Sequence, residues 1–156
     1  MSQSAKKNTK YMKPNELRLG NLFYPINRSG HVHIPIEIPF KILSIGNQVE
    51  AVKFDQIPAQ LEQIPKFSLR DLSEIDITGE WLVRFGFEDL TKNYGYPVFK
   101  LPSFDGQRQF RYSESSIWIV TVGSGWGWEL TNIKYIHQLQ NLFFAITGKE
   151  LEMSPA

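Results

Sequence analysis

The feature that most constrains the fold is a run of alternating apolar residues in the first third of the chain. From residue 32 to residue 42 every second side chain is apolar: Val32, Ile34, Ile36, Ile38, Phe40 and Ile42. A period of two places these side chains on one face of a β-strand, with the alternate residues toward solvent. Pro35 and Pro39 occupy alternate positions, and proline is tolerated in edge strands. The run therefore predicts an edge strand with one buried face.

The stretches on either side of this run predict a first antiparallel sheet. Residues 16–24 form an earlier candidate strand. Gly46–Asn47 separates the run from an apolar stretch at 49–54, which is typical of a two-residue hairpin. We expect these three strands to form a small meander, and we interpret it as an SH3-like partial barrel. The proline-interrupted residues 57–75 predict a packed connector with a short helical turn.

The second half of the chain predicts a helix, a second meander and a closing helix. Thr78 suits a helix N-cap, and Gly86 is a glycine of the kind that ends a helix. Residues 133–147 carry apolar side chains at intervals of three and four, so we expect a C-terminal helix packed on the second sheet, with Thr131 or Asn132 as its cap. The candidate strands between these helices are 96–101, 109–112, 117–122 and 126–130. Because the third of these strands is apolar at nearly every position, we expect it to be covered on both faces.

These elements predict an α+β fold with two antiparallel β-meanders, a short central helix and a C-terminal helix. We expect residues 14–156 to form a single domain, with an N-terminal β subregion at 14–76 and a helix–meander–helix subregion at 77–152. Residues 1–13 contain four lysines and no acid, and predict a disordered basic arm. With those four charges taken from the net charge of +1, the rest of the chain stands at −3. The arm is either a solubilising tail or an electrostatic contact to nucleic acid, and we favour the tail.

Composition excludes several classes of function. The chain has no cysteine, which excludes disulfides, thiolate metal sites and a cysteine nucleophile. No apolar run approaches the length that spans a bilayer, and the polar, basic start does not resemble a secretory signal. We therefore expect a cytoplasmic protein without a membrane partner, and no cofactor.

Catalytic and metal-binding patterns are weak in this sequence. His31 and His33 share one face of the predicted edge strand and could chelate a metal, but a zinc site needs at least a third protein ligand. Solvent-facing histidines are the alternative that we favour. Asp71, Glu74 and Asp76 form an acidic cluster that we interpret as solvated rather than catalytic. The glycines at 123–127 fit a hairpin turn and match no phosphate-binding loop, so the sequence disfavours an enzyme.

Aromatic and arginine residues concentrate in the second meander and give the strongest binding signal. The candidate binding residues there are Arg108, Arg111, Tyr112, Trp126 and Trp128, with Trp118 nearby. Aromatics interleaved with arginine on a sheet can stack bases, and the same residue types dominate protein interfaces. The third reading is core, and we favour it for most of these aromatics, with Trp126 and Trp128 on one face under the final helix.

Three strings in the chain together resemble a known group of proteins. They are Glu16–Asn21, Ile77–Phe87 and Ile133–Leu151. They resemble a family of small uncharacterised proteins encoded by prophages and mobile elements of gut-type bacteria. The resemblance begins near Met12, so residues 1–11 depart from it. It implies a phage or mobile-element context and carries over no catalytic residue.

His137 and Gln138 complete the set of candidate binding residues. Both lie in the middle of the third string, on the predicted final helix, where they either satisfy buried backbone groups or bind a partner. Our leading interpretation of the chain is a non-catalytic accessory protein that binds a protein, such as a host or defence protein. The alternative is a nucleic-acid-binding accessory protein, in which Arg108, Arg111 and Lys100 would share one basic face beside exposed aromatics. A hydrolase or nucleotide-handling protein would instead need a pocket that gathers Asp71, Glu74 or the histidines.

Overall fold

The structure is a computed structural model, and it describes residues 10–28, 34–101, 105–123 and 126–153. The described residues form an α+β fold with two antiparallel sheets and three α-helices. The sequence predicts the α+β class, the two sheets, the short central helix and the C-terminal helix, but not the one-turn helix at Thr91–Tyr94. The chain divides into two compact units, Met1–Ile75 and Asp76–Ala156. The boundary falls one residue before the predicted junction of the two subregions.

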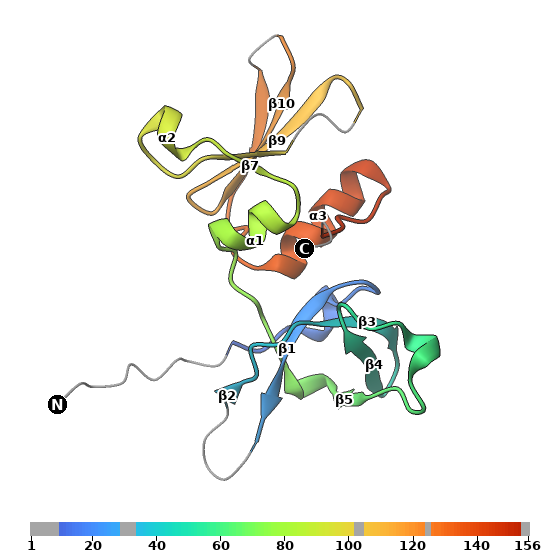
Figure 1. Ribbon diagram of the computed structural model, residues 1–156. Helices are drawn as coiled ribbons and strands as arrows, with labels where there is room; N and C mark the ends of the chain where they lie inside the picture. The colour runs from blue at the N-terminus through green and yellow to red at the C-terminus, as the bar shows by residue number, and fades with distance from the viewer. Residues whose placement is uncertain (1–9, 29–33, 102–104, 124–125, 154–156) are drawn as a thin grey trace, which may run out of the picture. The chain divides into compact units, whose positions relative to one another are not determined.

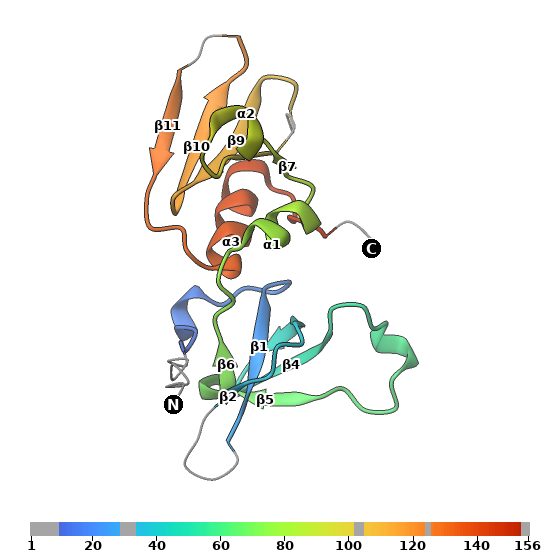
Figure 2. The ribbon, with the colours of Figure 1, turned by 60° about the vertical axis from the view of Figure 1, so that its left-hand side comes forward.

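The first unit contains one curled sheet (Figures 1 and 2). Its strands pair in the order β2–β1–β3–β4–β5, and β6 also pairs with β1. The strands are β1 (Leu22–Asn27), β2 (Ile34–Pro35), β3 (Phe40–Ile45), β4 (Gln48–Lys53), β5 (Lys66–Ser68) and β6 (Leu72–Ser73). Three short 3-10 helices flank them, at Pro14–Glu16, Pro58–Gln60 and Leu69–Asp71.

The long edge strand predicted at residues 32–42 is wrong in its middle. The structure has the short β2, then an irregular segment from Ile36 to Pro39, and then β3. Within the described part of the run, Ile34, Ile36 and Ile38 are exposed, and only from Phe40 onward do the side chains turn inward. Pro35 still pairs with Ile26 of β1, and the ladder stops after it and resumes only at Phe40, after Pro39. Proline has no N–H to donate, so it does not support a continuous ladder through this stretch.

The core of the first unit begins earlier in the chain than expected. Met12 is buried among Phe23, Ile42, Val49 and Leu72. Its N–H donates to the carbonyl of Leu72 at 3.0 Å, and the preceding residue, Tyr11, bridges Ser73. Residues 10–13 therefore do not belong to a disordered arm, and residues 1–9 lie outside the described part of the chain.

Other local predictions for the first unit fared differently. The hairpin at Gly46–Asn47 is confirmed, because β3 and β4 pair on either side of it. The stretch at 57–75, predicted as a connector, also contains β5 and β6. Both strands are too short to show a periodic pattern in the sequence. The strand predicted at 16–24 is displaced to β1, after a turn at Gly20.

The second unit contains a five-stranded antiparallel sheet and the α-helices. The sheet runs in the order β11–β10–β9–β8–β7, so β9 is central and β11 and β7 are its edges. Its strands are β7 (Glu88–Asp89), β8 (Phe99–Leu101), β9 (Arg108–Ser113), β10 (Ser116–Thr121) and β11 (Gly127–Leu130). The helices are α1 (Gly79–Arg84), α2 (Thr91–Tyr94) and α3 (Ile136–Thr147).

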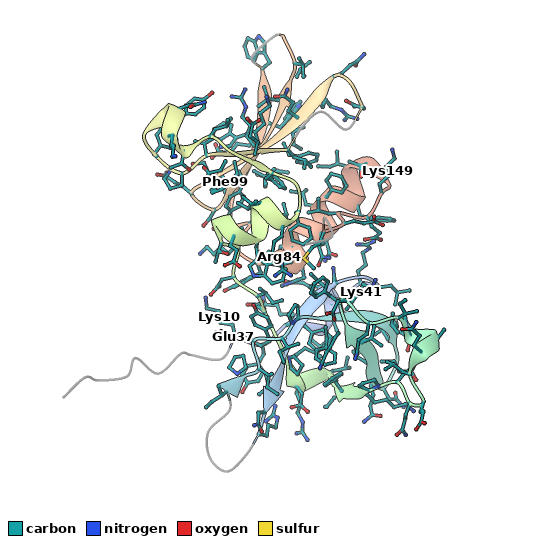
Figure 3. The ribbon with its side chains drawn as sticks, viewed as in Figure 1. Lys10, Glu37, Lys41, Arg84, Phe99 and Lys149 are labelled. Atoms are coloured by element: carbon teal, nitrogen blue, oxygen red, sulfur yellow. The ribbon has the colours of Figure 1, made fainter. Side chains whose placement is uncertain are left out.

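Helix α1 is capped at both ends as the sequence predicts. The Thr78 hydroxyl accepts a hydrogen bond from the Trp81 N–H at 3.3 Å. Gly86 has a φ of 87°, and the N–H of Phe87 donates to the carbonyl of Leu82 at 3.0 Å, which is a Schellman ending. Arg84, labelled in Figure 3, lies over the Trp81 ring at 4.5 Å from its centroid.

Helix α3 packs against one face of the second sheet. The Phe143 ring contacts the Phe110 ring of β9 at 5.4 Å between centroids, and both side chains are buried. Gly148 ends the helix in a left-handed conformation. The predicted caps Thr131 and Asn132 are wrong, because α3 begins only at Ile136 and Asn132 has a φ of 63°, which is outside the helical region.

The other face of the second sheet is not covered in the way the sequence suggested. In β10 only Ile117 is fully buried, and Trp118 is 39% exposed. Figure 1 shows α2 and α3 on opposite sides of β9 and β10, and α2 is a single short turn. The prediction that this strand is covered on both faces is therefore wrong. Its outer side chains line an open surface instead.

Candidate functional site

A groove of about 620 Å³ lies on the face of the second sheet that is opposite α3. We call it the sheet groove. Its floor comes from β9 and β10, and α2 with the segment after it supplies one wall. The lining residues are Tyr94, Tyr96, Val98, Arg111, Ser113, Glu114, Ser116, Trp118, Val120 and Glu129.

The register of the sheet explains why these side chains meet. Arg111 pairs with Trp118 across β9 and β10, and Trp118 pairs with Glu129 across β10 and β11. On the other side, Arg111 pairs with Lys100, and Lys100 pairs with Glu88. Directly paired residues point to the same face with Cβ atoms about 5 Å apart. One row across the sheet therefore carries an acid, two cations, an indole and a second acid.

Arg111 is the central polar group of the groove. Its Nε atom is buried, and no described residue accepts its hydrogen. A buried donor without an acceptor costs about 1–3 kcal/mol. The Arg111 side chain lies beside the partly exposed indole of Trp118 on the groove face.

The aromatic wall of the groove is held in place by short-range hydrogen bonds. A carboxylate oxygen of Asp89 accepts the N–H of Thr91 at 2.9 Å and sets the start of α2. Hydrogen bonds from Thr91 lower the pKa of Asp89, so the carboxylate stays ionised in this role. The Ser113 hydroxyl donates to the carbonyl of Pro97 at 2.6 Å and ties the wall to β9. The Tyr94 and Tyr96 rings then stand edge to face at 6.1 Å, each about half exposed.

The predicted basic face is divided between two faces of the sheet. Arg111 and Lys100 are neighbours on the groove face. Arg108 is three residues from Arg111 on the same strand, so it points to the opposite face. Its Nε also lies 2.8 Å from a carboxylate oxygen of Asp105. That hydrogen bond, with those from the backbone of Gln107 and Arg108, lowers the pKa of Asp105 to about 2. The structure therefore does not bring Arg108 to the groove.

Tyr112 is a core residue rather than a surface one. Its ring is buried, and its hydroxyl donates to the carbonyl of Ile133 at 3.0 Å. Burial raises the pKa of this phenol, because the charged form would lose its hydration. The side chain joins β9 to the segment before α3 and does not reach the groove.

Trp126 and Trp128 are exposed, contrary to the expectation that α3 covers them. Their side chains are 81% and 79% accessible. Helix α3 contacts the central strand β9, and β11 is the edge strand two positions away. Neighbouring strands are about 4.8 Å apart, so the helix lies about 10 Å from this edge. The prediction that the two indoles bind a partner stays a prediction.

His137 and Gln138 have structural surroundings in the described structure. His137 is fully buried, and its ring stacks on Tyr135 with centroids 6.0 Å apart. The Gln138 side-chain oxygen accepts the N–H of Lys134 at 3.0 Å and that of Tyr135 at 3.2 Å, at the start of α3. These contacts favour the structural alternative for both residues.

The remaining candidate residues from the sequence either lie away from the sheet groove or fall outside the described residues. His31 and His33 lie outside the described residues, so the weak metal prediction stays a prediction. Asp71 forms an ion pair with Arg28 in the first unit. The residues that line the sheet groove include no histidine and neither Asp71 nor Glu74.

Sequence reasoning missed part of the groove. Tyr94 and Tyr96 flank a glycine in a stretch with no periodic pattern, so nothing marked them as a wall. The positions of Trp118 and Glu129 could have been predicted from the strand register, which pairs Trp118 with Arg111 and Glu129 with Trp118.

Comparisons with known proteins add no assignment. No family model, no curated protein and no solved structure matches the chain. Among the described residues, no helix is long and apolar enough to cross a membrane.

Proposed function

We propose that this chain is a non-catalytic binding protein whose sheet groove receives a segment of a protein partner. The observation that carries the proposal is the open face of the second sheet, where the Arg111 side chain lies beside the exposed Trp118. Tryptophan, tyrosine and arginine supply most of the binding energy at protein interfaces, and all three line this groove.

The charge of the groove favours a protein over a nucleic acid. Its lining contains one arginine and two carboxylates, those of Glu114 and Glu129. A nucleic-acid groove needs an excess of positive charge along the phosphate backbone. Protein interfaces instead combine aromatic anchors with a polar rim of both signs. Nucleic acid is the second candidate, supported by the adjacent Lys100, Arg111 and Trp118.

The wider setting of the protein is also proposed. The family resemblance supports a phage or mobile-element accessory protein that acts in the bacterial cytoplasm on a host or defence protein. For the first unit we propose an SH3-like partial barrel, on the basis of its curled antiparallel strands β1, β3, β4 and β5.

A site-specific photo-crosslinking experiment tests the proposed groove. A photoreactive phenylalanine analogue replaces Tyr96 in the full chain, and a control chain carries it at Val83 on α1, which is equally exposed. Both are irradiated in bacterial lysate, with and without nuclease. We expect a protein adduct that forms from position 96, persists after nuclease treatment and weakens when Trp118→Ala is added.

The outcomes separate the two candidates. An adduct that disappears with nuclease, and whose yield falls steeply as salt rises, would support nucleic-acid binding instead. Equal adducts from positions 83 and 96 would contradict a specific groove. Circular dichroism of the Trp118→Ala chain checks that its fold is intact.

A further inference from the structure

The outer edge of β11 is the starting point of a second proposal, which does not depend on the sheet groove. Strand β11 pairs with β10 on one side, and no other described strand pairs with it. All four of its residues are exposed. Edge strands of this kind are normally protected by proline, lysine or a covering segment, because their free backbone groups can pair with another chain. Residues 127–130 contain neither proline nor lysine.

The register shows which backbone groups face outward. The N–H of Thr121 donates to the carbonyl of Trp126 at 2.9 Å, so these two residues form a hydrogen-bonded pair. Hydrogen-bonded and non-hydrogen-bonded pairs alternate along an antiparallel ladder. Gly127 and Glu129, which oppose Val120 and Trp118, are therefore non-hydrogen-bonded positions of that ladder. Their N–H and C=O groups point away from β10.

The side chains of this edge sort cleanly onto two faces. Trp126, Trp128 and Leu130 lie on one face, and all three are exposed, at 81%, 79% and 37%. Gly127 and Glu129 lie on the groove face. Gly127 is required by the fold, since a Cβ atom there would come within 2.7 Å of the backbone oxygen of Ile119. Beside Glu129, the groove face of β11 therefore carries no side chain at position 127.

We propose that the outer edge of β11 pairs antiparallel with the same edge of a second copy of this chain, around a two-fold axis at Trp128. In this register the outward N–H and C=O groups of Gly127 form hydrogen bonds with those of Glu129 of the second copy. Glu129 pairs in the same way with Gly127 of the second copy. Trp128 then faces Trp128 of the second copy, at the closely spaced type of pair.

We favour a second copy of the chain, paired around Trp128, because the charges and apolar side chains of the two edges then complement each other. Glu129 faces the empty side of Gly127 of the second copy, so no like charges meet. On the other face, Trp126 lies opposite Leu130 of the second copy, and Leu130 opposite its Trp126. The neighbouring two-fold register, centred on Glu129, would set two carboxylates face to face and place Trp126 opposite the polar Asn132 of the second copy. A strip of two tryptophans and a leucine from each copy is covered only in the Trp128-centred register.

Sedimentation velocity of the full chain across a concentration series tests the association. We expect a concentration-dependent dimer, its loss in Trp128→Lys, and its retention in Val83→Lys, which places the same charge on exposed α1. Far-UV circular dichroism checks the fold of both variants. A chain that stays monomeric at its highest soluble concentration overturns the proposal, as does a Trp128→Lys chain that still dimerises like wild type.

Disulfide crosslinking tests the register, because the natural chain has no cysteine. The proposed pairing brings the two Trp128 Cα atoms to about 4.5 Å, which is within the range of a disulfide. Trp128→Cys should therefore oxidise to a covalent dimer. Leu130→Cys alone should not, since its counterpart would lie four residues away, but a mixture of Leu130→Cys and Trp126→Cys chains should crosslink.

The crosslinking results decide the register directly. Val83→Cys measures the background from random collisions. Crosslinking of Leu130→Cys with itself at the rate of Trp128→Cys, or of Trp128→Cys at the background rate, overturns the register.

Discussion

The clearest quantitative prediction concerns Gln138, whose side chain the structure assigns to helix capping. Its Oε1 atom accepts two backbone N–H groups, at 3.0 and 3.2 Å, before the first turn of α3. Gln138→Ala removes both bonds and leaves both donors to water. Each such bond contributes about 0.5–1.5 kcal/mol, and the Lys134 and Tyr135 backbone is partly accessible to water, so we expect a loss of about 1–2 kcal/mol.

Urea unfolding followed by tryptophan fluorescence measures this loss selectively. All four tryptophans lie in the second unit, so the signal follows the unit that contains α3. With a slope of about 2 kcal/mol per molar urea, the midpoint should fall by about 0.5–1 M. Gln138→Glu is the matched control. Its carboxylate keeps both acceptors and places a negative charge in the first turn, so its midpoint should equal or exceed that of the natural chain.

A Gln138→Ala midpoint within error of the natural chain would refute the capping role. If that chain also no longer formed the adduct directed from position 96, Gln138 would be a binding residue instead.

Two further predictions concern acid stability and close packing. The pKa of Asp105 is lowered from 3.8 to about 2, so the stability that its carboxylate contributes is complete above pH 3.8 and is lost as the pH falls toward 2. Thermal unfolding between pH 2 and 5 should therefore show a weaker acid dependence for Asp105→Asn than for the natural chain. Gly79→Ala should destabilise by about 1–3 kcal/mol although alanine favours helices, because the new Cβ would lie 2.8 Å from Phe99 Cζ; in a Phe99→Leu background the urea midpoint should fall less.

Local signals in the sequence predicted much of the second unit. The Thr78 cap and the Gly86 ending of α1 depend on one residue each and on its immediate neighbours, and both are confirmed. The strands around residues 110 and 118 were recognisable because each is long enough to show its own pattern. Short elements such as β7 and α2 carry no such pattern and are stabilised by their tertiary contacts.

The groove could be predicted only in part, because exposure is a property of the assembled sheet. Trp118 and Trp128 are both apolar residues in strands, and the sequence alone suggested core for both. Trp118 is exposed because it lies on the face of the sheet opposite α3, whereas the exposure of Trp128 depends on how far α3 reaches across its own face. Helix α3 has twelve residues and lies on the central strand, so it does not extend to the edge strand β11. The distance from the helix to this edge cannot be predicted from a local sequence pattern.

The interrupted β2–β3 stretch has a consequence for the solubility of this protein. Ile34, Ile36 and Ile38 form an exposed isoleucine-rich segment, of a composition that stacks readily into intermolecular cross-β fibrils. Pro35 and Pro39 deny such a stack a backbone donor at every fourth residue. We therefore expect Pro35 and Pro39 to act as gatekeepers that hinder aggregation through this exposed segment.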